Sequence, residues 1–266
     1  MYKMLVCDLD GTLLSNFDDL PESNVLYIKK ALEKGIKVIL CSGRSPSSLK
    51  RFEERLGITA EGCYGIGLNG SVVYKCDTRE IINEIWFEKG VAEEIIRNLR
   101  KFDTDLLAYR GCDLYVEKMT PIIDHYVEKS GIKVTVVKNL ETIDIRLSKV
   151  LVKGSFEMLS SACDYMKNRL CERANMFFTG ETMLEFTDIK ATKGNGLRYL
   201  ADRLGINVKN VIAVGDNEND ISMIKAAGLG IAVQNAKDNI KQYADYVTEK
   251  TCAEGVLEEI MQKFVL

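Results

Sequence analysis

The amino-acid sequence predicts an α/β protein whose doubly wound, Rossmann-like parallel-sheet core is interrupted by an inserted α+β domain. Near both ends of the chain, short apolar runs alternate with segments of helical spacing, as in parallel sheets covered by helices. Between these ends, hairpin signals and short strands replace the alternation. We therefore expect residues 1–82 and 187–266 to form the core and residues 83–186 to form the inserted domain. The 266 residues are enough for two such units to bury a hydrophobic core.

The first part of the core reads as strand, helix, strand and helix. Gly35 ends the first helix, because glycine readily adopts the left-handed conformation that follows a helix C-terminus. Ser45 followed by Pro46 is typical of a helix start, with a capping side chain and a proline at the first helical position. Asn69-Gly70 between apolar runs indicates a tight hairpin. The expected strands are 3–7 and 36–41, and the expected helices are 22–34 and 46–57.

The inserted domain and the second part of the core follow the same rules of spacing. In the insert we expect helices at 91–101, 121–127 and 156–170, and strands at 106–109, 114–117, 134–137, 150–152, 176–178 and 183–186. After Lys193 the parallel pattern resumes with a helix to 204, a strand at 211–214, a helix to 227 and a strand at 231–233. Gly228 is expected to close the last of these helices.

Composition and charge exclude several classes of function. A net charge of -3 leaves no basic surplus for nucleic acid, and no apolar run approaches the length of a membrane span. Asp8 and Asp10 lie where a secretory segment would need its apolar stretch. The 8 cysteines include no C-x-x-C pair, and Cys7 and Cys41 lie in apolar runs where a reduced thiol packs as a small hydrophobe. We expect a soluble, reduced, cytoplasmic protein, with a monomer as the simplest state.

The single histidine, His125, lies in a predicted helix without any motif around it. Histidine-based triads and histidine-rich metal sites would have to use this residue. A surface or packing role fits it better, so we do not expect histidine chemistry.

Acidic residues follow two of the apolar runs, and open parallel sheets bind ligands beyond the carboxyl ends of their strands. Asp8 and Asp10 come directly after the first strand, and their i, i+2 spacing lets both side chains point to one side of an extended chain. Two such carboxylates repel each other and need a cation or a shared proton. The segment 215–220 follows the strand at 211–214 and holds three acidic residues without a basic partner. This arrangement suits a hard cation with oxygen ligands.

Two further segments indicate phosphate binding less strongly. Ser42-Gly43-Arg44 follows the second strand and precedes a helix, where a hydroxyl group and backbone N–H groups can hold a phosphate, although a loop that only caps the helix fits equally well. Lys193-Gly194 begins a helix, and a solvated lysine would explain it too. The segment 65–70 matches G-x-G-x-x-G but leads into a strand-like run instead of a helix, so we reject a dinucleotide site there.

Taken in order, these four segments resemble the four motifs of the haloacid dehalogenase superfamily, and specifically its Cof-type sugar-phosphate phosphatases with a large α/β cap. D-x-D-G-T at Asp8–Thr12 and G-D-x-x-N-D at Gly215–Asp220 form a highly specific combination, and no motif position departs from the pattern. The resemblance spans nearly the whole chain, and the insert lies where the family's cap is expected. It implies a Mg²⁺-dependent phosphatase that acts on small phosphorylated metabolites.

The resemblance also implies a role for each matched residue. Asp8 would be the nucleophile that forms an aspartyl-phosphate, and Asp10 would act as general acid and then as general base. Lys193 would offset the repulsion between the nucleophile and the phosphate. The metal would be held by Asp8, the backbone carbonyl of Asp10 and Asp216, while Asp220 would act through a bound water or on Lys193. The phosphate-binding groups would be Leu9 through its backbone N–H, Ser42, Gly43, Lys193 and Asn219, with Arg44 as a further candidate for substrate contact.

Several alternatives remain open at the level of sequence. A phosphomutase of the same superfamily would use the same residues and return the phosphoryl group to the sugar. A receiver-like signalling module also carries a phosphorylated aspartate on a doubly wound sheet, but it would lack an acid/base at Asp10 and the long insert. A binding protein without catalysis would be expected to lack one of Asp8, Asp10, Lys193 or Asp216. The motifs do not distinguish a hexose phosphate from a pentose phosphate, pyridoxal phosphate or a nucleotide, and the Asn69-Gly70 loop could contact any of them.

Overall fold

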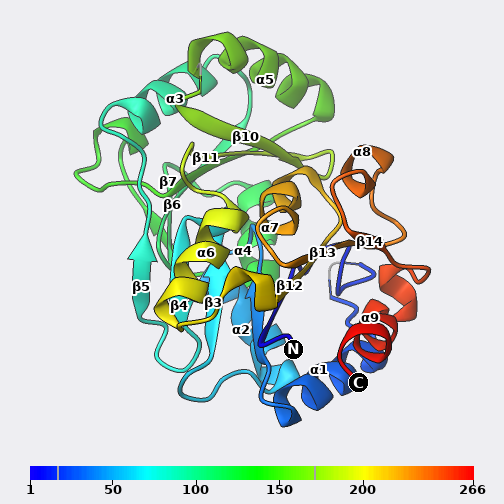
Figure 1. Cartoon of the computed structure of the whole chain (residues 1–266). Helices are drawn as coiled ribbons and strands as arrows, with labels where there is room; N and C mark the ends of the chain where they lie inside the picture. The colour runs from blue at the N-terminus through cyan, green and yellow to red at the C-terminus, as the bar shows by residue number, and fades with distance from the viewer. Residues whose placement is uncertain (17, 171) are drawn as a thin grey trace. The chain divides into compact units, whose positions relative to one another are not determined.

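The computed structural model describes residues 1–16, 18–170 and 172–266, and it divides into two compact units (Figure 1). Unit 1 consists of Met1–Arg44, Leu49–Ile82 and Thr192–Leu266, and unit 2 consists of Asn83–Ala191 together with Ser45–Ser48. Unit 2 ends at Ala191 because strand β11 (Met183–Asp188) continues past Phe186, where the sequence pattern had placed the boundary.

Unit 1 is built on an eight-stranded sheet with the order β14-β13-β12-β1-β2-β3-β4-β5. The strands from β14 to β3 run parallel, and β4 is antiparallel to β3. This confirms the predicted Rossmann-like core, because the chain starts in the middle of the sheet and winds toward both edges. The strands are β1 (Met4–Cys7), β2 (Lys37–Cys41), β3 (Tyr64–Gly67), β4 (Val72–Lys75), β5 (Ile81–Glu84), β12 (Val211–Gly215), β13 (Leu229–Ala232) and β14 (Tyr246–Val247).

The helices connected to this sheet begin and end where local chemistry favours it, and the first turn of α2 lies in the Ser45–Ser48 segment that groups with unit 2. The Ser45 hydroxyl accepts a hydrogen bond from the Ser48 N–H at 3.3 Å, and the Thr192 hydroxyl caps the next long helix by accepting from the Asn195 N–H at 3.1 Å. Gly35 has a φ of 76° after the first helix, as predicted. The helices are α1 (Glu22–Glu33), α2 (Pro46–Leu56), α6 (Lys193–Arg203), α7 (Ile221–Ile224), α8 (Asp238–Lys241) and α9 (Val256–Phe264), with short 3₁₀ turns η1 (Leu68–Gly70), η3 (Val208–Asn210), η4 (Glu218–Asp220) and η5 (Cys252–Glu254). Helices α1 and α9 lie side by side near the two ends of the chain (Figure 1).

The helix predicted to reach Ala227 is shorter than expected, because α7 ends at Ile224. Gly228 does not act as a left-handed helix terminator. A Cβ atom on Gly228 would lie 2.1 Å from the carbonyl oxygen of Lys209, so a glycine is required there for two backbone segments to pass closely. The following strand, β13, consequently starts two residues earlier than the predicted strand at 231–233.

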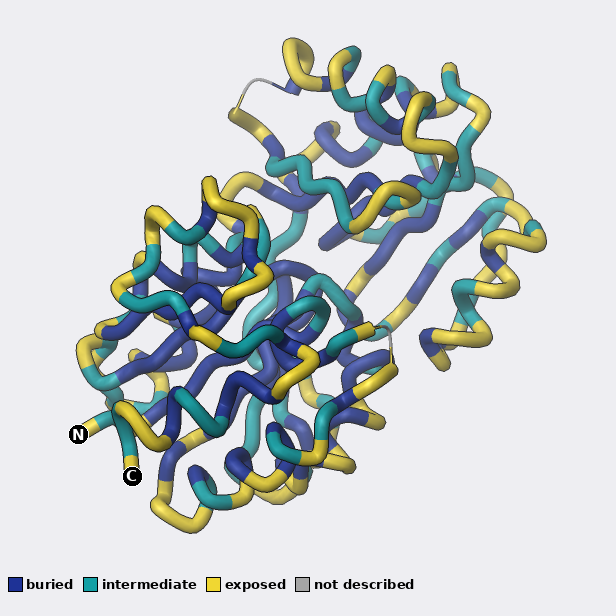
Figure 2. Tube along the Cα trace, turned by 90° about the vertical axis from the view of Figure 1, so that its right-hand side faces the viewer, coloured by how far each residue is buried: buried dark blue, intermediate teal, exposed yellow. Residues whose placement is uncertain are grey.

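Unit 2 contains a six-stranded sheet with the order β10-β11-β9-β6-β7-β8. Apolar residues of helices α3 and α5 pack with Val150, Val152 and Phe186 of this sheet into a separate hydrophobic core. Figure 2 shows the buried residues along the inner trace of the molecule and the exposed ones along outer helices and loops. The elements are β6 (Asp105–Arg110), β7 (Asp113–Val116), β8 (Val134–Val136), β9 (Lys149–Lys153), β10 (Ala174–Thr179), β11, α3 (Val91–Leu99), α4 (Pro121–Ser130), α5 (Phe156–Leu170) and the 3₁₀ turn η2 (Leu140–Thr142). His125 lies on α4 and is exposed.

Among the helices of the described ranges, none combines the length and the apolar character that crossing a membrane would require.

Candidate active site

The carboxyl end of β1 starts the candidate site. Asp8 is buried, and its backbone N–H donates to the Val214 carbonyl at 2.9 Å, so the sheet pairing with β12 extends to this residue. The chain then turns, with the Leu9 carbonyl accepting hydrogen bonds from the N–H groups of the residues at 12, 13 and 14. Gly11 has a φ of 81°, and a Cβ atom there would lie 2.7 Å from Asp216 Oδ2. A glycine is therefore needed both for the turn and for the approach of Asp216.

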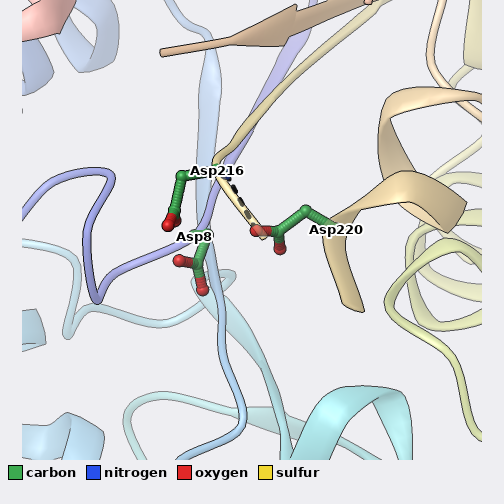
Figure 3. Close-up of side chains that lie close together, drawn as sticks. All are labelled: Asp8, Asp216 and Asp220. Atoms are coloured by element: carbon green, nitrogen blue, oxygen red, sulfur yellow. Dashed lines mark hydrogen bonds between the residues drawn. The ribbon is translucent and has the colours of Figure 1, made fainter. Parts of the chain in front are cut away.

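Three carboxylates converge beyond β1 and β12, those of Asp8, Asp216 and Asp220 (Figure 3). One oxygen of each lies within 4.8 Å of the others. Asp220 Oδ2 accepts hydrogen bonds from the backbone N–H groups of Asp216 and Asn217, both at 3.0 Å, and Figure 3 shows the first of these as a dashed line. The Thr12 hydroxyl donates to Asp216 Oδ1 at 2.8 Å. These hydrogen bonds fix the orientation of the Asp216 and Asp220 carboxylates beside Asp8.

Lys193, the first residue of α6, places a buried ammonium group beside this cluster. Its Nζ donates to Asp8 Oδ1 at 2.5 Å and to Asp220 Oδ1 at 2.6 Å. Burial by itself would lower the pKa of Lys193, but the charges of Asp220 and Asp8 outweigh it and raise that pKa. Lys193 is therefore a permanent cation at physiological pH.

The three carboxylates can carry more negative charge than the Lys193 ammonium group compensates. Burial, followed by the charge of Asp220, raises the pKa of Asp8 well above its usual range, and Lys193 opposes that shift only in part. Burial and then Asp220 also raise the pKa of Asp216 to about 6. The cluster thus disfavours its own full ionisation, as expected for a group of buried carboxylates that lacks a counter-ion. Oxygen ligands with surplus negative charge fit a hard divalent cation such as Mg²⁺.

The Asp10 side chain does not join the three carboxylates. It pairs instead with Arg44, whose Nε and Nη2 donate to its two oxygens at 2.8 and 2.5 Å. The Asp10 carboxylate is 42% exposed, whereas Arg44 is 11% exposed and lies over the ring of Phe52. Asp10 is therefore the one acidic side chain of the first motif that is open to solvent. Its pairing with Arg44 was not predicted from the sequence.

The remaining candidate residues lie around the same end of the sheet. Ser42 is buried directly after β2, and its hydroxyl accepts a hydrogen bond from the Arg44 N–H at 3.2 Å, across Gly43. The Nδ2 of Asn219 donates to Oδ1 of Asn69 at 2.9 Å. Asn69 comes from the hairpin between β3 and β4, which confirms the predicted turn and shows that the segment 65–70 leads into a strand. All the sequence-predicted site residues belong to unit 1.

Two contributors were missed or left open by sequence reasoning. Thr12 was read only as part of the first motif, although a hydroxyl four residues after Asp8 suits a hydrogen bond to a neighbouring carboxylate. For Asn69, the sequence indicated only a possible contact with the substrate. The glycine after it marked the turn, but no local pattern pairs residue 69 with residue 219.

The comparison with known proteins agrees with this geometry. A family model described as haloacid dehalogenase-like hydrolase matches residues 5–260. The chain belongs to this family. The hydrolase is 29% identical to the 5-amino-6-(5-phospho-D-ribitylamino)uracil phosphatase YcsE of Bacillus subtilis, over 97% of its own length and 94% of the relative. It is 28% identical to the phosphatase YwpJ of the same organism, over 96% and 97% of the two chains.

A solved structure supports the same assignment. The fold of the hydrolase matches the crystal structure of a haloacid dehalogenase-like hydrolase from Bacteroides thetaiotaomicron with a TM-score of 0.86 and 28% identity, over 99% and 100% of the two chains. The predicted family resemblance is confirmed, and the hydrolase is a phosphatase.

Proposed function

We propose that the hydrolase is a Mg²⁺-dependent phosphatase that releases phosphate from small phosphorylated metabolites through an aspartyl-phosphate on Asp8. The observation that carries this proposal is the charge imbalance of the buried cluster. Among the described residues, the buried ammonium group that contacts the cluster of Asp8, Asp216 and Asp220 is that of Lys193. Such a cluster is suited to take up a divalent cation and then a phosphate dianion beside it.

The residues present fit Mg²⁺ as the cation. Asp8 and Asp216 would bind it directly together with the backbone carbonyl of Asp10, and Asp220 would act through a bound water. Asp220 already accepts two backbone hydrogen bonds and one from Lys193, which favours this supporting role. When bound, the metal supplies positive charge that offsets the repulsion between a carboxylate and a phosphate.

The catalytic steps are assigned to Asp8 and Asp10. A carboxylate oxygen of Asp8 attacks phosphorus as the bond from phosphorus to the leaving oxygen breaks. Asp10, released from Arg44 and protonated from solvent, gives its proton to that oxygen. Asp10 then takes a proton from the water that hydrolyses the aspartyl-phosphate. The solvent exposure of Asp10 supports this exchange of protons, whereas the burial of Asp8 keeps the nucleophile away from bulk water. Lys193 remains charged throughout and lowers the energy of the negative charge near Asp8.

The substrate is proposed to be a phosphate ester of a small hydroxylated compound. YcsE is named for an ester of this kind, in which the phosphate is carried on a ribityl chain. Ser42, the N–H groups of Leu9 and Gly43, Lys193 and Asn219 would hold the phosphate oxygens, and Arg44 is a candidate for contact with the rest of the molecule. Unit 2 would serve as the cap that recognises the non-phosphoryl part. Reduced thiols buried in β1 and β2 suit the cytoplasm as the place of this activity.

A phosphate-release screen tests the proposal. The purified protein is assayed against sugar, polyol and nucleoside phosphates and an aryl phosphate, with MgCl₂ and then with excess chelator. We expect release that depends on Mg²⁺, returns when Mg²⁺ is added back, and is lost in Asp8→Asn. Full activity in chelator would contradict the assigned mechanism. Turnover that needs a bisphosphate activator would favour a phosphomutase instead.

A further inference from the structure

The turn η1 between β3 and β4 contacts three of the four motif segments of unit 1. The N–H of Leu68 donates to the Arg44 carbonyl at 2.9 Å, and the N–H of Asn69 donates to the Ser42 carbonyl at 3.0 Å. The side chain of Asn69 accepts the hydrogen bond from Asn219. A Cβ atom on Gly70 would lie 2.1 Å from the carbonyl oxygen preceding Lys193, so the turn also packs directly on the start of α6.

The backbone of this turn is more strained than a hairpin requires. Leu68, Asn69 and Gly70 have φ values of 50°, 58° and 93°. Glycine adopts such values freely and asparagine more readily than most residues, so the strain falls on Leu68. An Asn-Gly pair alone can reverse an antiparallel hairpin. Leu68 and Asn69 are also fully buried, at 0% and 1% exposure. Strain of this kind persists where the surrounding contacts determine the conformation, here the contacts with the motif segments.

The side chain of Asn219 depends on Asn69 for its orientation. Within the described residues, Asn69 makes the one hydrogen bond to the side-chain amide of Asn219, and Asn219 Oδ1 is buried without a partner. The Nδ2 group carries two hydrogens, of which Asn69 engages one. The second is a donor suited to a phosphate oxygen.

We propose that Asn69 is a positioning residue for phosphate binding, which holds the amide of Asn219 toward the phosphate while its own backbone anchors Ser42. Asn69 itself is not assigned a contact with the substrate. This inference rests on the proposed function for the identity of the ligand. The contacts among Asn69, Asn219 and Ser42 are observed independently of that function.

A double-mutant cycle tests the proposal. Asn69→Gly removes the side chain but keeps the left-handed backbone, and Asn219→Ala removes the group that Asn69 is inferred to hold. The dissociation constant of inorganic phosphate is measured by calorimetry in MgCl₂, and KM and kcat are measured on an aryl phosphate. We expect each single variant to weaken phosphate binding and raise KM on the order of tenfold, with a smaller change in kcat, as for the loss of one hydrogen bond to a charged group. The double variant should be no weaker than Asn219→Ala alone.

A matched control separates positioning from general damage to the fold. Asn207 caps η3 by accepting a hydrogen bond from the Lys209 N–H at 3.0 Å, so Asn207→Gly removes an asparagine side chain outside the site. It should leave phosphate binding unchanged. Losses that add in the double variant, or unchanged phosphate binding in Asn69→Gly, would overturn the proposal. Phosphate binding without turnover by the wild-type protein would overturn the proposed function alone, and absence of phosphate binding would overturn both.

Discussion

In the part of the chain that the structure describes, each unit contains a lysine buried against acidic side chains, and the two sites differ in their contacts. In unit 2, Lys149 of β9 pairs with Glu185 of β11 at 2.8 Å, with side-chain exposures of 2% and 5%. In unit 1, Lys193 contacts both Asp8 and Asp220, and Asp216 lies beside them. Among the described residues, the ammonium group of Lys149 contacts the one carboxylate of Glu185, which also lies within the electrostatic reach of Lys153. The ammonium group of Lys193 instead contacts two carboxylates, with a third beside them.

This difference shows that burial alone does not mark a functional charge. In a buried ion pair with equal and opposite charges, each charge compensates the other, so no ligand is needed for charge balance. In unit 1, burial and then the charge of Asp220 raise the pKa of both Asp8 and Asp216, and Lys193 opposes these shifts only in part. We therefore expect the pair in unit 2 to serve the fold and the cluster in unit 1 to serve the chemistry.

The largest expected effect is a difference in turnover between variants of Lys193 and Lys149. Lys193→Met removes the cation beside the nucleophile, and we expect its kcat on an aryl phosphate to fall by about 10³-fold. Lys149→Met, the matched variant in unit 2, should keep the wild-type rate per folded molecule. Steady-state kinetics with the folded fraction measured by circular dichroism would check both. Equal losses in the two variants would break the distinction between the sites.

The second largest expected effect is a loss of folding stability in variants of Lys149. Lys149→Met removes the ammonium group that pairs with the buried Glu185, so we expect the free energy of unfolding to fall by about 3 kcal/mol. Replacing both residues, with Lys149→Met and Glu185→Leu together, removes the uncompensated charge and should restore most of that loss. Chemical denaturation of the three proteins measures this directly. A double variant as unstable as the single one would show that the pair does more than balance its own charge.

The smallest effect is a dependence of stability on pH in the metal-free protein. The pKa of Asp216 is about 6 in the folded state and 3.8 when unperturbed, so the folded state binds more protons between these values. Stability should therefore fall as the pH rises from about 4 to 6, by roughly 1–2 kcal/mol, and Asp8 shifts in the same direction.

Magnesium should reverse this trend, because it binds the ionised carboxylates. Its stabilisation should grow as the pH rises through about 6, as measured by thermal denaturation in MgCl₂ and in chelator from pH 5 to 8. Asp216→Asn should show a weaker dependence of stability on pH. A stabilisation by magnesium that is the same at every pH would contradict the inferred excess of negative charge at Asp8, Asp216 and Asp220.

Much of the site could be predicted because it lies at the ends of adjacent parallel strands. Asp8, Ser42 and Asp216 follow β1, β2 and β12, and parallel pairing places those ends next to each other. Strand order and strand ends do not predict contacts that depend on the direction of a side chain. The pairing of Asp10 with Arg44 is of this kind, because it depends on which way two flexible side chains turn.

Other features could not be predicted because they depend on non-local register. Lys149 and Glu185 come together only because β9 and β11 pair with a particular alignment, in which Lys149 lies opposite Thr187. Gly228 looked like a helix terminator, and only the approach of Lys209 shows why a glycine stands there. The hydrogen bond from Asn219 to Asn69 likewise joins residues that no local pattern relates.

The most direct test of the account is to trap the phosphoryl group on the predicted nucleophile. Asp10→Asn keeps Asp8, Lys193 and the backbone carbonyl at residue 10, but removes the group that activates water. With an aryl phosphate, whose leaving group needs no proton, Asp8 should still be phosphorylated and the product should persist. Mass spectrometry after an acid quench should then show one added phosphoryl group on the peptide that contains Asp8, and none when Asp8→Asn is added. A phosphoryl group on another residue, or normal turnover by Asp8→Asn, would contradict the assignment of Asp8 as the nucleophile.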